Sequence, residues 1–288
     1  MTAALRYEWT RLRTLRSTWW LTFGVLAVGV GFTAIAALVV RVNVHADQIN
    51  GSTLDGDMAR FYVEAAMTQF SVVDPMFYLV AFVAAIVGIL GWGHEYRHGM
   101  IRATLTAVPK RWAVFTAKYA VVALWVSVLV VTSCLLSLLV AGVFFTGLDV
   151  QYDAGDILST VVRHVVYSVL VTWVAMSLTV LVRHQTFALV MLFLWPMGIE
   201  TLFKAFGVMV SAFTGNKDYV HVMRFLPFNA GGRIMQTFGA LPDGTFGRQQ
   251  DLSVFGDPLS LVGGLVVFGG FAALLTAAAF AAFTTRDA

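Results

Sequence analysis

The chain has 288 residues, of which 59% are hydrophobic and only 12% are charged, and its mean hydropathy is +0.79. A soluble domain of this size could not bury so much apolar surface, so the composition predicts an integral membrane protein. The net charge of +3 is too small to indicate a nucleic-acid partner, and the single cysteine, Cys134, excludes a disulfide framework or a thiolate metal cluster.

The first 18 residues predict a helix that lies in the membrane interface. Leu5, Trp9 and Leu12 recur at helical spacing, while Arg6 and Arg13 fall mostly on the other side. A basic amphipathic helix of this kind binds along the inner surface of a membrane. The same arginines also act as a topology signal, and the two interpretations are compatible.

Six stretches are apolar over the roughly 20 residues that a membrane-spanning helix needs. They cover residues 19–40, 76–93, 115–145, 157–182, 187–203 and 259–283. The fifth is the least regular, because Glu200 and Lys204 interrupt its outer end. We expect these two residues to pair across one helical turn. The whole chain, residues 1–288, is predicted to be one all-α transmembrane domain.

The distribution of charge predicts the orientation of the spans. Arginine and lysine gather before the first span, in the segment from 94 to 118 and at Arg183. Aspartate and glutamate gather after the first span, in residues 47–74, and after the third span, in residues 149–156. Because basic loops stay inside, we predict a multi-pass protein of the cell membrane with both termini in the cytoplasm.

The segment after the second span contains an H-E-x-x-H pattern at His94, Glu95 and His98, which is typical of zinc metalloproteases. Such a site also needs a third ligand. The best candidate, Asp243, is predicted on the opposite side of the bilayer, and Arg97 inside the motif opposes a dication. We therefore predict no metal site, and a zinc-dependent membrane metalloprotease that uses these three residues is kept as an alternative function.

The same loop, residues 94–114, also predicts a short projecting helix. Gly99 permits a sharp turn after the span, and Pro109 ends a helix, which leaves residues 100–108 between them. Arg97 and Arg102 could meet acidic groups of a soluble partner. The apolar residues expected to enter a groove on that partner are Met100, Ile101, Leu105 and Val108. The alternative is an ordinary basic loop that is kept inside by its charge.

The run from Glu95 to Lys118 resembles the first cytoplasmic loop of ATP-binding-cassette (ABC) transporter permeases of the type-2 exporter family. The matching positions are Glu95, Gly99, Leu105, Pro109, Arg111 and Lys118, while Met100 stands where the family more often has threonine. The resemblance extends to the amino-terminal helix, the six spans and residues 226–231, which are similar to the re-entrant region before the last span.

This resemblance implies a permease subunit of an ABC exporter whose short helix docks on a separate ATPase. The implied coupling residues are Glu95, Arg97, Gly99, Met100, Ile101, Arg102, Leu105 and Pro109. Because the sequence contains no G-x-x-x-x-G-K-[ST] stretch, ATP and magnesium would be bound by the partner ATPase, and this chain is expected to be neither an enzyme nor a cofactor binder. A second permease chain, identical or related, would complete the unit within the membrane lipid. A non-transporting ABC-like immunity or sensing protein shares these features and is a second alternative.

The fourth span carries a polar stripe at four-residue spacing. Its members are Thr160, His164, Ser168 and Thr172. Polar residues at membrane depth usually face the interior of a bundle or an aqueous path, so the stripe is a candidate translocation surface. The alternative is that His164 lies near the outer interface and reaches the water there. The apolar lining favours an amphipathic or hydrophobic substrate.

Small residues predict close helix contacts on the third and sixth spans, either within a subunit or between two. They are Ser133, Ser137 and Ala141 on the third span and Gly263, Gly264, Gly269 and Gly270 on the sixth. The outer segment between spans five and six, residues 204–258, mixes phenylalanines with glycine-rich turns. It is expected to form re-entrant or interfacial helices buried against the bundle.

Overall fold

The computed structural model describes residues 2–49, 78–147, 154–216, 218–235 and 259–285, and every regular element within these ranges is helical. Six helices in this part of the chain are long and apolar enough to cross a membrane. The chain is therefore a multi-pass membrane protein, and the predicted all-α class with six spans is confirmed.

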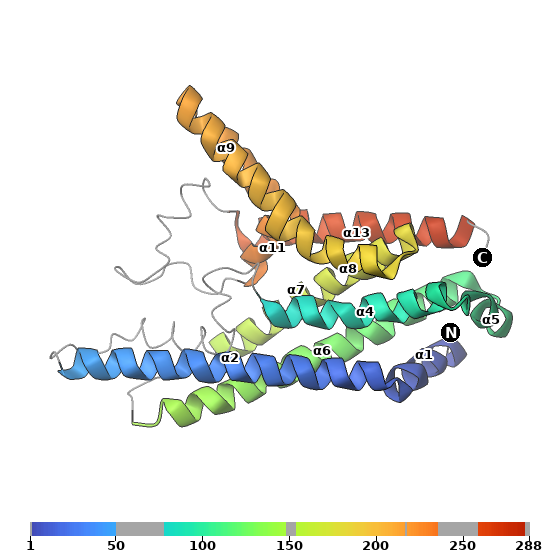
Figure 1. Ribbon diagram of the computed structural model, residues 1–288, viewed down its shortest axis with the longest axis horizontal. Helices are drawn as coiled ribbons and strands as arrows, with labels where there is room; N and C mark the ends of the chain where they lie inside the picture. Colours follow the sequence, from blue (N-terminus) through green and yellow to red (C-terminus); the bar gives the residue numbers. More distant parts are fainter. Residues whose placement is uncertain (1, 50–77, 148–153, 217, 236–258, 286–288) are drawn as a thin grey trace.

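Five of the six spans are single helices, whereas the remaining one, the fifth in chain order, is composed of three consecutive helical segments (Figure 1). The five are α2 (Arg16–Ile49), α4 (Leu79–Arg97), α6 (Arg111–Phe144), α7 (Ala154–Val182) and α13 (Leu261–Thr285), and the fifth span comprises α8 (Gln185–Leu194), η2 (Trp195–Glu200) and α9 (Thr201–Thr214). Five short elements complete the described chain, namely α1 (Thr2–Thr14), α5 (Ile101–Ala107), α10 (Asp218–His221), η3 (Val222–Phe225) and α11 (Pro227–Met235).

Helix α4 occupies the centre of the bundle. It packs against α2, α6, α7 and α8, and most of its side chains are buried, with one half-buried face at Leu79, Val83, Ile86 and Leu90. A helix that is apolar on every face is stable only when neighbours cover it all round. Among these side chains, Phe82 and Trp92 fill space between helices, while Ala81, Ala84 and Ala85 let the neighbouring backbones approach. Movement of α4 would therefore disturb most of the other spans.

Helices α1 and α5 and the last turn of α13 lie at the same end of the bundle, which we call the α5 end (Figure 1). Helix α1 packs on α6 and buries Ala4, Glu8 and Leu12, one residue from each successive turn. A helix is present at the amino terminus, and its position in the membrane interface stays a prediction. Its buried stripe includes a glutamate that the apolar pattern did not include.

The fifth span is longer than the sequence analysis predicted. Residues 187–203 were expected to span and 204–258 to lie outside, but the helical path continues to Thr214 and leaves the bundle at an angle (Figure 1). Pro196 has no amide hydrogen, so the helix widens into a π-turn there instead of ending. Glu200 does not interrupt the span either, because its carboxylate is used by another helix.

That helix is α11, which begins at Pro227 and packs on α7 and α13. The amide nitrogens of Phe228 and Asn229 donate to the two carboxylate oxygens of Glu200 over 2.8 and 2.9 Å. Glu200 thus satisfies amides at the start of a helix that would otherwise lack partners. The helix predicted before the last span is confirmed up to residue 235, and residues 236–258, including Asp243, lie outside the described ranges.

Close contacts occur at some of the predicted small residues and not at others. The hydroxyl of Thr33 on α2 donates to Ser137 Oγ on α6 over 2.8 Å, so this contact lies within one subunit. A Cβ atom built on Gly264 would lie 2.5 Å from the carbonyl oxygen of Ala230 on α11. Around Gly269 and Gly270 there is open space. Only the first part of the glycine stripe on α13 therefore holds two helices together.

We predict that Gly264→Ala lowers the free energy of unfolding by about 1–3 kcal/mol, because the new methyl group cannot fit without moving the backbone of α11. Gly269→Ala is the matched control on the same helix, and it should be neutral or slightly stabilising. Thermal unfolding of the purified chain in detergent compares the two variants. Equal melting temperatures for both would contradict this description of the contact between α11 and α13.

Candidate functional site

A cluster of four charges, three of them buried and Arg11 half-buried, ties three helices together at the α5 end. Lys118 on α6 places its Nζ 2.7 Å from Oε1 of Glu95 on α4 and 3.2 Å from Oε1 of Glu8 on α1. Arg11 on α1 donates to the same oxygen of Glu95 and lies 3.5 Å from Glu8. Glu95 and Lys118 each expose only 1% of their side chains, so the charges balance each other almost without water.

The backbone of α4 contributes to the same charge cluster. The carbonyl oxygen of Gly91 accepts from Arg11 Nη2 at 3.1 Å and from Lys118 Nζ at 3.2 Å. The ammonium group of Lys118 also lies 4.7 Å from the centre of the Trp92 ring. Buried ions are stable only when such partners replace their hydration shells. The geometry of the cluster meets this condition at each cation.

The chain reverses direction immediately after the charge cluster. Gly99 has a φ of +64°, a left-handed conformation that disfavours other residues, and the amide of Met100 donates to the carbonyl of Glu95 over 3.0 Å. Helix α4 itself continues to Arg97, so Glu95 lies in the last turn of the span. The short helix predicted between Gly99 and Pro109 is confirmed as α5, and its first residues are fastened to the backbone of Glu95.

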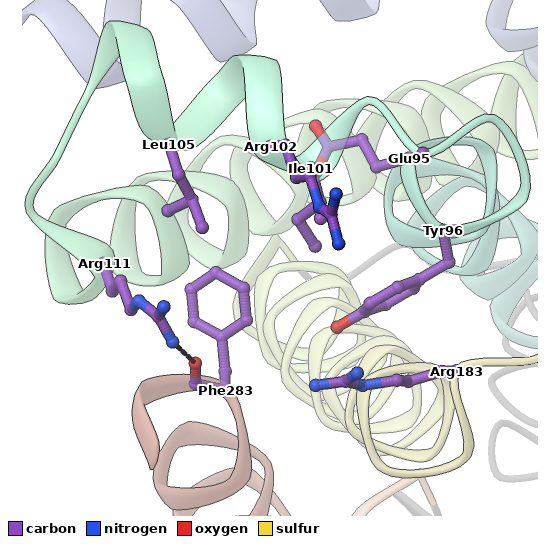
Figure 2. A pocket seen from close by; sticks show the side chains of 9 residues that line it. Glu95, Tyr96, Ile101, Arg102, Leu105, Arg111, Arg183 and Phe283 are labelled. Carbon is purple, nitrogen blue, oxygen red and sulfur yellow. Dashed lines mark hydrogen bonds between the residues drawn. The ribbon is translucent and has the colours of Figure 1, made fainter. Parts of the chain in front are cut away.

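The apolar residues of α5 face their own chain. Ile101 is 9% exposed and Thr104 is 5% exposed, while Leu105 and Val108 are half-buried against the core. We expected Ile101, Leu105 and Val108 to enter a groove on a partner, but all three pack at least partly against the bundle of their own chain, as Figure 2 shows for Ile101 and Leu105 beside Phe283. The exposed face of α5 and its flanks consists instead of Arg97, Met100, Arg102, Ala103, Thr106 and Pro109.

The two histidines of the H-E-x-x-H pattern lie next to each other, with ring centroids 6.1 Å apart. Between them in the sequence, the Glu95 carboxylate is held by Arg11 and Lys118 through Oε1, and its side chain is only 1% exposed, so a water molecule has little access to it. Among the described residues no third His, Cys, Asp or Glu joins the pair, and Asp243 is not among them. This arrangement does not favour zinc chemistry.

The polar stripe of α7 faces the interior of the bundle. Thr160, His164, Ser168 and Thr172 are all at most 2% exposed. His164 Nδ1 lies 2.7 Å from the carbonyl oxygen of Thr160, and the ring meets Tyr78 edge-on with the centroids 4.8 Å apart. His164 therefore does not reach the water, which rules out that alternative. The stripe lies along the side of α7 that packs on α4.

Sequence reasoning did not assign a role to Glu8, and it treated Arg11 only as a topology signal. The signal that could have found them is that Glu8 is the only acidic residue before Asp47, in a segment otherwise rich in arginine. A lone glutamate there is out of place in a basic interfacial helix. Its partner Lys118 is 110 positions away, so no local pattern connects the two.

We predict that Glu95→Gln lowers the free energy of unfolding by about 3–5 kcal/mol, because Arg11 and Lys118 would remain buried with too little negative charge. Adding Lys118→Met should recover part of the loss, since the double variant removes one charge of each sign. Arg97→Gln, an exposed change on the same helix, should cost about 0.5 kcal/mol or less. Denaturant unfolding in micelles measures all three, and a Glu95→Gln cost no larger than that of Arg97→Gln would contradict the prediction.

Comparison with known proteins places the chain in a family without assigning it an activity. The model of the family described as "Protein of unknown function (DUF2705)" matches residues 47–245, which is well over half of the chain. The match includes α4, the charged residues Glu95 and Lys118, α5 and the polar stripe of α7. No curated protein matches this chain. The chain belongs to the DUF2705 family.

Proposed function

We propose that this protein is the membrane-spanning permease subunit of an ATP-driven ABC exporter. In this proposal it moves a substrate across the cell membrane with energy from a separate ATPase subunit. The observation that carries the proposal is the position of α5, a short helix that stands at one end of a six-span bundle and is fastened to the central helix beside a buried charge cluster.

The mechanism begins with the attachment of α5. The amide of Met100, the residue before α5, donates to the carbonyl of Glu95, and Ile101 packs into the core, so α5 cannot move far without moving the end of α4. The Glu95 carboxylate is in turn bonded to Arg11 on α1 and Lys118 on α6. A displacement of α5 by a partner would therefore be transmitted to α4, α1 and α6 through direct contacts. A two-state transporter requires such transmission from its coupling element.

The direction of transmission along α4 leads to the polar stripe. Helix α4 packs along α7, and Tyr78, just before the start of α4, contacts His164 in the stripe. The stripe is closed in the present arrangement, since its four members are buried. A tilt of α4 relative to α7 would open the seam between them and expose hydroxyl and imidazole groups to a substrate. We therefore assign the translocation path to this seam.

The ATPase subunit would contact the exposed face of α5. Arg97 and Arg102 flank this face and favour an acidic rim on the partner, while Met100 offers a half-exposed apolar contact at its centre. ATP and magnesium would be bound entirely by that partner, because the sequence lacks a phosphate-binding loop. A second permease chain, identical or related, would complete the transporter.

We predict that cysteines introduced at Ala103 or Thr106 form short-range cross-links to the partner ABC ATPase when the two chains are co-expressed. Both positions are exposed on the outward face of α5, whereas Thr104, the centre of the helix, is buried and unsuitable. The only native cysteine, Cys134, is buried and should stay unreactive.

The control is Thr146→Cys, an exposed position that follows α6 at the end away from α5. Cross-links from Ala103 and Thr106 but not from Thr146 would support docking on α5. Equal yields from all three, or none from α5, would refute it. A cross-linked pair that hydrolyses ATP without moving any substrate into vesicles would favour an immunity or sensing protein over an exporter.

A further inference from the structure

Two atoms of the polar stripe on α7 have no hydrogen-bond partner. Thr172 satisfies its own hydroxyl, because its Oγ1 donates to the carbonyl oxygen of Ser168 over 2.7 Å. His164 Nε2 and Ser168 Oγ are fully buried, and among the described residues nothing lies within hydrogen-bonding reach of either atom. In the interior of a membrane, an unsatisfied polar group lowers the stability of the protein. Buried polar atoms of this kind are rare in proteins, and a binding site is one reason to retain them.

The hydrogen bond on the other side of the His164 ring determines what the free nitrogen can do. Nδ1 lies 2.7 Å from the carbonyl oxygen of Thr160, which can only accept, so we assign the proton of the neutral imidazole to Nδ1. Nε2 then carries a lone pair and accepts a hydrogen bond. Ser168 lies one turn further along the same face of α7, and its hydroxyl can donate or accept. The two atoms therefore offer an acceptor and a donor to one polar group.

Tyr78 and Cys134 join His164 and Ser168 from two neighbouring helices, and we call these four residues the polar layer. The ring of Tyr78, just before α4, meets the His164 ring edge-on with the centroids 4.8 Å apart. The Tyr78 hydroxyl faces the thiol of Cys134 on α6, which is only a weak hydrogen-bonding group. Because none of the four residues is a carboxylate, a cationic group in the layer would lack a counter-ion. The chemistry favours a group that is polar and uncharged.

Aromatic rings line the seam beside the polar layer. Phe82 on α4 stacks on Phe228 of α11 with the centroids 6.1 Å apart, and it lies 5.8 Å from the ring of Phe193 on α8. Phe228 and Tyr167 both contact Phe268 on α13, at 5.3 and 5.6 Å between centroids. All but Phe193 are buried. A molecule held at the polar layer would therefore meet apolar, aromatic surface next to its polar group.

We propose that the seam between α4 and α7 binds an uncharged hydroxyl group carried on an apolar molecule. The hydroxyl donates to His164 Nε2 and accepts from Ser168, while the apolar part lies against Phe82 and Phe228. This proposal rests on the export function, since it names the class of substrate that the seam would carry, a neutral amphiphile with an alcohol group. Such a molecule supplies the partners that the two buried atoms lack, so its binding favours an open seam over a closed one.

The test is photolabelling of the full-length chain in lipid nanodiscs, without an ATPase. The probe is dodecanol with a diazirine in its chain, and three analogues replace the hydroxyl with a methyl ether, a carboxylate or an ammonium group. Mass spectrometry of the digested chain measures the label in residues 78–85 and 164–172. We expect the alcohol to label these residues roughly three to ten times more strongly than the methyl ether, because an ether cannot donate to His164 Nε2.

Two substitutions remove the proposed contacts. Ser168→Ala deletes a hydroxyl without a partner, so the melting temperature should stay the same or rise, whereas labelling by the alcohol should fall about threefold or more. His164→Asn keeps a side-chain donor near Thr160 and removes the acceptor at Nε2, so the preference for the alcohol should disappear. The matched control is Thr179→Ala, which removes a buried hydroxyl of the same helix that donates to the carbonyl oxygen of Ala175 over 2.8 Å. It should be labelled as the wild type is.

Three results would overturn the proposal. Equal labelling by the alcohol and the methyl ether would show that the seam does not recognise a hydroxyl. An equal loss in Ser168→Ala and Thr179→Ala would show that the polar layer has no special part in binding. Stronger labelling by the carboxylate or the ammonium probe would assign the seam to a charged substrate.

The ATPase plays no part in this experiment, so its outcome is separate from that of the export function. A preference for the alcohol in a chain that has no ATPase partner would support the hydroxyl site and refute the exporter. Absence of that preference in a chain that does engage an ATPase would refute the hydroxyl site and leave the exporter in place.

Discussion

The structure depends most on the ion pairs that join Glu95 to Arg11 and Lys118. Moving a single ion from water into a protein interior costs several kcal/mol, and only close partners with suitable hydrogen bonds offset that cost. Glu95 can be buried because two cations reach it from two other helices, and Lys118 can be buried because two carboxylates and a backbone carbonyl reach it. Neither ion would be stable there if α1, α4 or α6 moved away alone.

This mutual requirement explains why α5 stands where it does. The turn at Gly99 is bonded to the backbone of Glu95, so the cluster that fixes the end of α4 also fixes the start of α5. The helix turns its apolar residues inwards and a mixed polar face outwards. In our proposal the outer face meets an ATPase, and the inner face holds α5 against the bundle.

Much of this arrangement could be predicted from local sequence, because local physical rules produce it. Hydropathy gave the six spans, and Gly99 with Pro109 gave α5, since turning and helix-breaking depend on single residues. Local rules failed where a distant partner decides the outcome. Glu200 looked like the end of a span until its carboxylate was found to cap α11, 28 positions away. Ile101 and Leu105 looked like partner contacts because an amphipathic pattern does not say what its apolar face will meet. Glu8 was overlooked since its partner Lys118 belongs to another helix.

The central claim is that this chain converts ATP hydrolysis by a partner into movement of its spans, and purification from its own cells tests this most directly. The tagged chain is extracted in mild detergent, and ATP hydrolysis is measured in the eluate. After reconstitution, the rate of ATP hydrolysis by the ATPase is compared with and without the chain. We expect an ABC ATPase to co-purify in equal amounts, with hydrolysis that rises when the chain is present and falls in Glu95→Gln. An eluate that contains the folded chain with no ATPase, or an ATPase whose hydrolysis ignores the chain, would contradict the account.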